Sequence, residues 1–156
     1  MKIKVLIVCS SNKGRISPFI DDQVHSLRGM EIEIDYYLIK GKGIWGYINN
    51  LKKLKIKIKL FNPNILHAHY GLSGLLANLQ RSVPVVTTFH GSDINYKRAL
   101  KYSKLAYKLS KASIFVSNDM LSKIRNKNRA TIVPCGVDID IFKPLPINSL
   151  DVLRFS

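Results

Sequence analysis

The residues best suited to chemistry in this sequence lie in the stretch 85–93, which reads VVTTFHGSD. Its β-branched half follows Pro84 and predicts a buried strand, and its polar half predicts the turn after that strand. In an open α/β sheet, ligands bind at the carboxyl ends of the strands, and His90 falls at such an end. Gly91 permits a sharp turn or the close approach of a ligand. His90 is therefore the candidate catalytic residue, and the alternative is a histidine that is hydrogen-bonded within the fold.

Two more histidines and one aspartate accompany His90. The spacing of His67, His69 and His90 suggests a metal site, but we expect no metal because no carboxylate or thiol completes a ligand set. We expect His67 and His69 to point to opposite faces of a strand, so that at least one of them is structural. Asp93 is suited to orient a hydroxyl group or to cap the next helix, and capping is favoured because an aspartate at a helix start accepts hydrogen bonds from free amides.

Length and composition describe a single folded domain. The chain has 156 residues, of which 46% are hydrophobic, enough for one domain with a core. Cys9 and Cys135 are far apart and lack metal-ligand spacing, which indicates a reduced, cytosolic protein without disulfides. The apolar run 5–9 is too short for a signal peptide and predicts a first strand. No run approaches the ~18 apolar residues of a membrane span.

The charge balance is strongly basic, with 25 lysine and arginine residues against 10 aspartate and glutamate residues and a net charge of +15. Such a surface attracts polyanions, which include nucleic acids, anionic lipid headgroups and phosphorylated small molecules. The aromatic residues are mostly in core-like positions, and no RNP-like or helix-turn-helix pattern appears. Nucleic acid is therefore not an expected partner.

Strand and helix patterns alternate along the chain. Strands are expected at 2–9, 31–38, 64–69, 83–89, 112–116 and 130–133, and helices at 18–27, 44–60, 71–81, 94–110 and 119–125. This alternation predicts an α/β protein with a Rossmann-like parallel sheet and helices on both faces. The loop after the first strand contains Gly14 but no GxGxxG pattern, which counts against a dinucleotide-binding domain.

The segment 44–60 combines two periodicities. Its apolar residues fall on one helical stripe over the full length, whereas residues 54–60 alternate as in a strand. A basic amphipathic helix fits the longer window, with Ile56 and Leu60 off the stripe. Lys52, Lys53 and Lys57 are then candidates to face an anionic membrane. The alternative is a helix that covers the sheet and has a solvated basic face.

The end of the chain differs in character. Residues 142–146 read as a stiff connector, and residues 150–156 begin a new strand pattern. We expect one domain over 1–144, followed at 145–156 by a linker and the start of a missing C-terminal domain.

Three segments occur in an order that resembles a known family. They are NPNILHAHYG at 62–71, TFHGSD at 88–93, and VPCGVD at 133–138 followed by Phe142 and Pro144. Together they resemble the amino-terminal domain of retaining GT-B glycosyltransferases of family four. Asn64 stands where aspartate is usual, and Cys135 stands where asparagine is usual.

The resemblance implies one half of a GT-B fold, in which two Rossmann-like domains face a cleft. The first domain mainly binds the acceptor, and the second binds a nucleotide-sugar. His90 would lie near the transferring sugar. The loop with Gly14 and Arg15 borders the same cleft, although family members usually carry two adjacent glycines there. His69, Gly91 and Asp93 complete the candidate acceptor and cleft residues.

The implied activity is transfer of a sugar from a nucleotide-sugar to a glycan or lipid-linked acceptor, in bacterial cell-surface polysaccharide biosynthesis. Neither a metal nor a cofactor is implied, and the location is cytoplasmic, with peripheral attachment to the inner face of the cell membrane. Because the donor-binding residues belong to the second domain, we expect the 156-residue chain alone to be inactive. The alternative is a non-catalytic domain that binds an anionic surface or polyanion. The donor sugar, acceptor and linkage cannot be read from this half.

Overall fold

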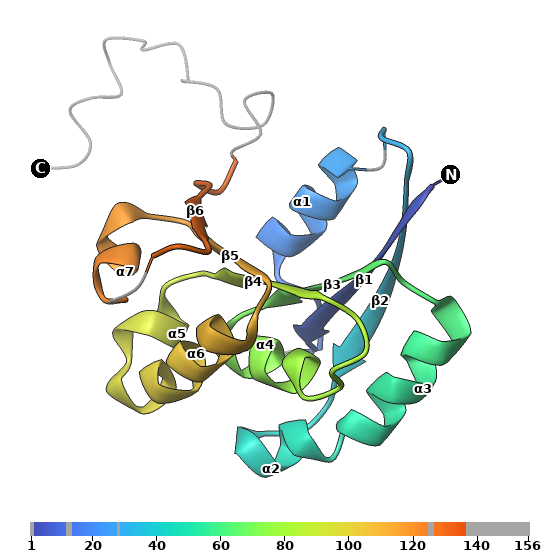
Figure 1. Ribbon diagram of the computed structural model, residues 1–156, viewed down its shortest axis with the longest axis horizontal. Coiled ribbons are helices and arrows are strands. Elements are labelled where there is room, and N and C mark those ends of the chain that lie inside the picture. The colour runs from blue at the N-terminus through green and yellow to red at the C-terminus, as the bar shows by residue number, and fades with distance from the viewer. Residues whose placement is uncertain (1, 12–13, 28, 125–126, 137–156) are drawn as a thin grey trace, which may run out of the picture.

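A parallel six-stranded sheet forms the centre of the computed structural model, which describes residues 2–11, 14–27, 29–124 and 127–136 (Figure 1). The strand order is β2-β1-β3-β4-β5-β6, and each neighbouring pair is parallel. The strands are β1 (Ile3–Ser10), β2 (Ile32–Ile39), β3 (Ile65–His69), β4 (Val85–Phe89), β5 (Ala112–Phe115) and β6 (Ala130–Ile132). The predicted α/β class with a Rossmann-like parallel sheet is confirmed.

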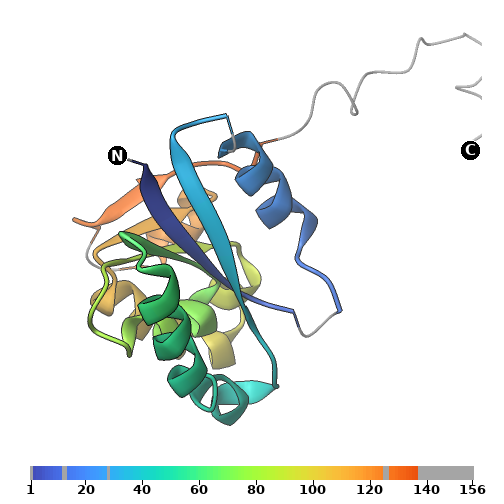
Figure 2. The same cartoon turned by 90° about the vertical axis from the view of Figure 1, so that its right-hand side faces the viewer.

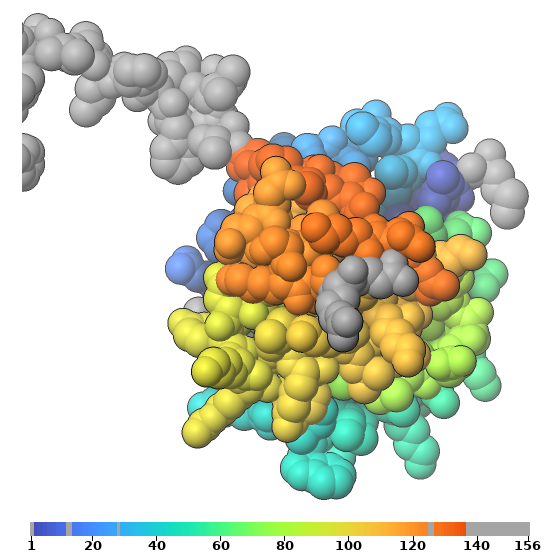
Figure 3. Space-filling model, turned by 60° about the vertical axis from the view of Figure 1, so that its left-hand side comes forward, coloured from blue at the N-terminus to red at the C-terminus, as the bar shows by residue number. Residues whose placement is uncertain are grey.

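Helices cover both faces of this sheet. They are α1 (Pro18–Leu27), α2 (Gly43–Ile48), α3 (Leu51–Phe61), α4 (Gly71–Asn78), α5 (Ser92–Asn95), α6 (Lys97–Leu109) and α7 (Asn118–Ser122). α1 lies on one face, and α3, α4 and α6 lie on the other (Figures 1 and 2). The space-filling view shows α5 and α6, in yellow, next to α7 and β6, in orange (Figure 3).

The period-two alternation of β1 separates the core into layers. Leu6 and Val8 pack with buried residues of α3 and α4, whereas Ile7 and Cys9 pack with buried residues of α1. Cys9 is fully buried, and burial raises the pKa of its thiol to about 11. The strand is therefore apolar on both sides, as in a sheet covered on both faces.

The predicted helix 44–60 is two helices, which corrects the single-helix interpretation. The joint is the buried Asn50, whose side-chain Nδ2 donates to the carbonyls of Lys40 at 2.9 Å and Gly46 at 2.6 Å. An asparagine that bonds nearby backbone groups in this way favours a break over helix continuation. Residues 54–60 are helical, so the strand-like alternation there did not decide the structure.

The predicted helix 94–110 is also divided. α5 ends at Asn95 and α6 starts at Lys97, because Tyr96 between them has an extended backbone. α4 ends three residues before the predicted Arg81, whose φ of 66° is left-handed. α7 is capped by Ser117, whose hydroxyl accepts from the Met120 amide. The predicted linker at 145–156 lies outside the described residues.

Candidate functional site

The carboxyl ends of β3 and β4 bring the histidines together. His67 pairs in register with Ile7 of β1, and His69 pairs with Thr88 of β4. His67 and His69 therefore share the face of the sheet that α1 covers, and their ring centroids are 4.4 Å apart. The prediction that they point to opposite faces is wrong, because residues two apart on a strand point to the same face.

His69 is the inner member of a hydrogen-bonded pair with His90. The distance between His69 Nδ1 and His90 Nε2 is 3.0 Å, and the two rings are stacked. The exposed fraction of His69 is 0%, whereas His90 is half-buried. His67 bonds elsewhere, with its Nε2 at 2.8 Å from the Thr88 hydroxyl. The structure thus joins His69 to His90 but leaves His69 no surface for direct contact with a ligand.

Two aromatic side chains hold His90 from the sides, and sequence reasoning missed both. The ring centroid of Phe19, in the first turn of α1, lies 4.6 Å from that of His90. Tyr70, directly after β3, lies at 4.8 Å. The position of Tyr70 beside the HAH segment was a usable signal. Nothing local in the sequence indicates that α1 places Phe19 over the β4 turn.

The backbone of Tyr70 is strained. Its φ of 72° and ψ of 153° lie in a region that is essentially reserved for glycine, at a cost of order 1–3 kcal/mol. The Tyr70 amide donates to the Thr88 carbonyl at 2.9 Å, and the Tyr70 carbonyl accepts from the Gly74 amide at 2.9 Å. These bonds hold the residue in a conformation that brings its ring against His90. Strain of this kind occurs preferentially at ligand-binding and active sites.

Asp93 ties the two turns together through backbone amides. Its Oδ2 accepts from the Gly71 amide at 3.0 Å, and its Oδ1 accepts from the Gly91 and His90 amides at 3.0 and 3.1 Å. The prediction that Asp93 caps the next helix is wrong: Asp93 lies inside α5, and the helix-start amide from which it accepts is that of Gly71 in α4. Burial raises the pKa of this carboxyl group, and the amide bonds oppose that rise. With both oxygens engaged, Asp93 holds the main chain around His90.

Burial also determines the charge of the histidines. It lowers the pKa of His67 and of His90 to about 4, and it also lowers the pKa of His69 well below its ordinary value, with the neighbouring His67 and His90 rings contributing in the same direction. All three imidazoles are therefore neutral near pH 7. A neutral imidazole carries one N–H donor and one lone pair, so His90 is equipped for hydrogen bonding rather than for ion pairing.

The loop after β1 reaches the same edge of the sheet. Gly14 has a φ of 81°, and its amide donates to the Ser11 carbonyl at 2.9 Å. Gly14 and Arg15 are both exposed, and Gly91 is buried in the turn after β4. The predicted cleft residues thus divide into two groups. One group is buried next to His90 and consists of Gly91, Asp93 and His69. The other lies in the exposed loop that leads to α1 and consists of Gly14 and Arg15.

The lysine candidates lie on α3, which covers the face of the sheet opposite α1 (Figure 2). Lys52 and Lys53 are exposed, whereas Lys57 forms an ion pair with Asp35 of β2. The exposed fractions of Ile56 and Leu60 are 57% and 80%, so both lie off the buried stripe as predicted. None of these residues joins the histidine site.

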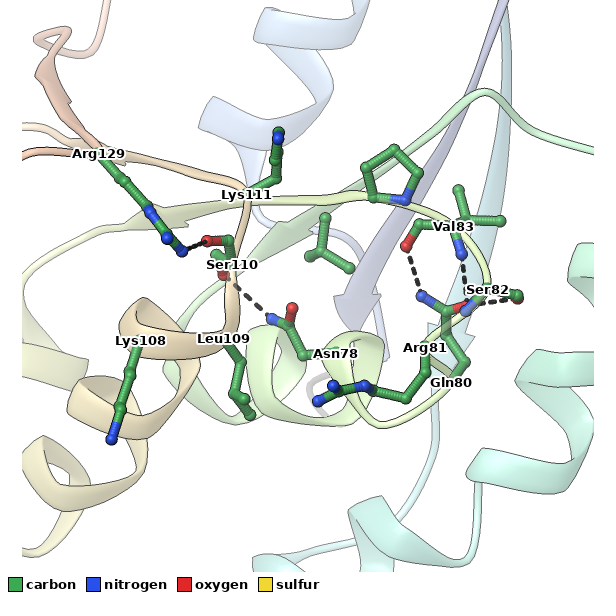
Figure 4. A pocket seen from close by; sticks show the side chains of 12 residues that line it. Asn78, Gln80, Arg81, Ser82, Val83, Lys108, Leu109, Ser110, Lys111 and Arg129 are labelled. Atoms are coloured by element: carbon green, nitrogen blue, oxygen red, sulfur yellow. Dashed lines mark hydrogen bonds between the residues drawn. The ribbon is translucent and has the colours of Figure 1, made fainter.

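A pocket of about 500 Å³ opens at the other edge of the sheet, where β4 begins (Figure 4). Its lining includes four basic residues: Arg81, Lys108, Lys111 and Arg129. α4 and α6 end here, and cations near helix C-termini complement the partial negative charge of free carbonyls. Arg129 also donates to the Ser110 carbonyl at the end of α6. We interpret this pocket as a stabilising junction of helix ends.

Within the described residues, no group of three or more histidine, cysteine, aspartate or glutamate side chains is arranged to hold a metal ion. In the same part of the chain, no helix has the length and apolar character needed to cross a membrane.

The parallel sheet with helices on both faces defines a Rossmann-like domain, and in open sheets of this class ligands generally bind at the carboxyl ends of the strands, where the histidines lie here. The chain belongs to Glycosyltransferase Family 4, whose family model matches residues 1–141. The family predicted from the three sequence segments is therefore confirmed. No curated protein sequence matches it.

Solved structures share this fold at low sequence identity. Sucrose-phosphate synthase from Thermosynechococcus elongatus is 14% identical, with a TM-score of 0.70 over 93% of this chain and 51% of that one. A second, shorter structure of that enzyme is 12% identical, with a TM-score of 0.66 over 90% and 92% of the two chains. The lipopolysaccharide outer core galactosyltransferase WaaB, in its apo form, is 14% identical, with a TM-score of 0.63 over 89% and 47%.

These neighbours are GT-B glycosyltransferases, which confirms the predicted half of a GT-B fold. The chain spans about half the length of the longer sucrose-phosphate synthase chain and of WaaB.

Proposed function

We propose that this domain forms the acceptor side of a retaining glycosyltransferase that transfers a sugar from a nucleotide-sugar to a glycan or lipid-linked acceptor. The observation that carries the proposal is His90, a neutral and half-exposed imidazole clamped at the carboxyl edge of the sheet by His69, Phe19 and Tyr70. A ligand at this edge meets a polar group of fixed orientation between aromatic rings. That combination suits a sugar, which has both hydroxyl groups and apolar C–H faces.

The charges of the site indicate which part of the reaction this domain would serve and which part a second domain would serve. When a sugar leaves a diphosphate, negative charge develops on the leaving group and needs electrostatic stabilisation. The neutral histidines here are unsuited to that task, so a second domain would supply the cations. His90 would hydrogen-bond a hydroxyl group near the reacting sugar. On this proposal the 156-residue chain alone is inactive, and neither a metal nor a cofactor takes part.

The proposal predicts that His90→Ala in the complete enzyme lowers kcat by ~10²-fold or more, the usual scale for a positioned polar or acid–base group. His25→Ala is the matched control, because His25 is an exposed histidine on α1 and its loss should leave kcat unchanged. Circular dichroism and thermal unfolding establish that both variants are folded. A folded His90→Ala enzyme with unchanged kcat would contradict the assignment.

The acceptor role has a separate test that uses the 156-residue chain. Glycan and lipid-linked acceptors and a panel of nucleotide-sugars are titrated into it by calorimetry. Acceptors should bind, and nucleotide-sugars should bind far more weakly because the second domain would hold them. The reverse preference would place the donor on this domain and overturn the acceptor role.

A second function, peripheral attachment to the cytoplasmic face of an anionic membrane, is favoured by the outward side of α3. This α3 outer face consists of exposed residues only: Lys52, Lys53, Ile56, Lys59 and Leu60. Exposed apolar side chains among lysines are typical of helices that lie in a membrane interface. Lys57 contributes less, because it pairs with Asp35. Vesicle co-sedimentation tests the attachment and also tests the alternative of a non-catalytic domain for anionic surfaces.

A further inference from the structure

His69 is the most deeply buried polar side chain of the site, and only one of its two ring nitrogens has a partner within the described residues. Its exposed fraction is 0%, and its Nδ1 lies 3.0 Å from His90 Nε2. Its Nε2 is buried with no hydrogen-bond partner in that part of the chain. Buried polar side-chain atoms nearly always have a partner, so this nitrogen constrains which hydrogen arrangement the pair adopts.

Two arrangements of hydrogens satisfy the short contact. Both rings are neutral, so in each ring only one of the two nitrogens carries a hydrogen. If His90 donates from Nε2, then His69 accepts at Nδ1 and must carry its own hydrogen on the buried, unpartnered Nε2. If His69 donates from Nδ1, then only a lone pair remains at its Nε2.

The second arrangement has the lower free energy. A buried N–H group without an acceptor forfeits a donor bond that water satisfied in the unfolded chain, and such orphaned donors are rarer in folded proteins than under-satisfied acceptors. His69 is thereby the donor. His90 accepts at Nε2, and its one hydrogen is on Nδ1.

We propose that His69 is a positioning residue that fixes His90 in the Nδ1–H tautomer, so that His90 presents a hydrogen-bond donor to a ligand hydroxyl group. The role of that donor rests on the function proposed above, whereas the tautomer itself does not. The stacked His69 ring and the flanking Phe19 and Tyr70 rings restrict rotation of the His90 ring.

The assignment limits the chemistry open to His90. Its only lone pair is occupied by the His69 N–H, so the ring has no free basic nitrogen with which to remove a proton from an acceptor hydroxyl. His90 therefore acts toward its ligand as a donor and not as a general base. His69, which has no exposed surface, acts only through His90.

The test is the tautomeric state of His90, measured by long-range ¹H–¹⁵N NMR correlations on the 156-residue chain labelled with ¹⁵N-histidine. The four histidines give a small set of signals, and the exposed His25 serves as the internal reference. Two variants bracket the proposal. His69→Asn keeps an N–H donor close to the position of Nδ1, and His69→Phe keeps a ring without any donor.

We expect His90 to carry its hydrogen on Nδ1 in the wild-type chain and in His69→Asn, and to shift toward the Nε2–H form in His69→Phe. The tautomer of His67, whose hydrogen-bond partner is the Thr88 hydroxyl, should stay the same in all three proteins, although its chemical shifts will respond to the change in the neighbouring His69 ring. An Nε2–H tautomer or a mixture of tautomers for wild-type His90 overturns the proposal, as does an unchanged tautomer in His69→Phe.

If His69→Phe does not fold, the wild-type chain and His69→Asn still decide the matter. The kinetic effect of His90→Ala is a separate measurement, so failure of the proposed function is distinguishable from failure of this tautomer assignment.

Discussion

At the scale of single residues, neutrality is the shared property of the three site histidines. Desolvation by the sheet and by α1 removes their charge, and hydrogen bonds to His90 and Thr88 then settle their orientation. His90 could be singled out from the sequence because it follows a β-branched run and precedes a glycine. The 21-residue separation of His69 and His90 hides their contact, since it depends on which strands are neighbours.

The pH dependence of stability provides a residue-scale prediction. Burial holds the pKa of His67 at about 4 in the folded chain, against an ordinary value of 6.5. The unfolded chain binds the proton first, so the stabilisation is complete above pH 6.5 and is lost as the pH falls from there toward 4. A pKa difference of that size between the folded and unfolded chain lowers the free energy of unfolding by about 3 kcal/mol once the pH is below both values. Asp93 has the opposite effect: because its pKa is raised in the folded chain, its protonation on acidification increases the free energy of unfolding.

Urea unfolding measured at a series of pH values from neutral down to about pH 4 checks this prediction. His67→Gln retains a hydrogen-bonding group near Thr88 but does not titrate, so its unfolding free energy should depend less steeply on pH. His25→Gln is the control, since His25 is exposed. If His67→Gln keeps the wild-type slope, His67 is not the group that links acidity to unfolding.

At the scale of elements, periodicity predicted the strands and helices well and the breaks between them poorly. The start and end of α1 agree with its sequence signals, a proline at the first helical position and a glycine after the end. The breaks at Asn50 and Tyr96 depend on tertiary hydrogen bonds and backbone turns that no local pattern encodes. The helix α4 contains small residues and packs closely on β4 at Gly74.

The packing of α4 on β4 predicts that Gly74 cannot be enlarged without loss of stability. A Cβ atom at Gly74 would lie 2.6 Å from Thr87 Cγ2 and 2.7 Å from Thr87 Oγ1. Thr87 is fully buried and hydrogen-bonded to Ser110, so it has little freedom to move. Overpacking of this kind costs ~1–3 kcal/mol. Alanine recovers at most about 1 kcal/mol of helix propensity, so Gly74→Ala should be destabilising overall.

Chemical denaturation measures that loss, with Gly29→Ala as the matched substitution. A Cβ at Gly29 meets no atom within 4 Å, so its effect should stay within about 0.5 kcal/mol. Equal effects of the two substitutions would show that α4 does not pack on β4 as closely as described.

At the scale of the whole molecule, the two faces of the sheet differ in the chemistry of their side chains. The α1 face carries the histidine cluster, which is neutral, and the α3 face carries exposed lysines and apolar side chains. The net charge of +15 was visible in the sequence, but its distribution was not. Some cations complement helix C-termini around the pocket at the start of β4, and Lys57 is paired. On the α3 outer face, exposed lysines and the exposed apolar side chains of Ile56 and Leu60 lie on one side of a single helix.

The last prediction concerns that face. The domain should co-sediment with vesicles that contain anionic lipid, because each lysine near such a surface contributes about 1 kcal/mol and Ile56 and Leu60 add apolar contact. Reversing Lys52, Lys53 and Lys59 to glutamate removes about 3 kcal/mol, which corresponds to a loss of roughly a hundredfold in binding. Added salt should weaken wild-type binding by screening. Reversing Lys97, Lys101 and Lys104 on α6, which are exposed and do not line the pocket, makes the same change in net charge elsewhere and should weaken binding far less. Equal pelleting with neutral and anionic vesicles, no pelleting with either, or equal losses in the two triple variants would mean that the α3 outer face is only a solvated helix surface.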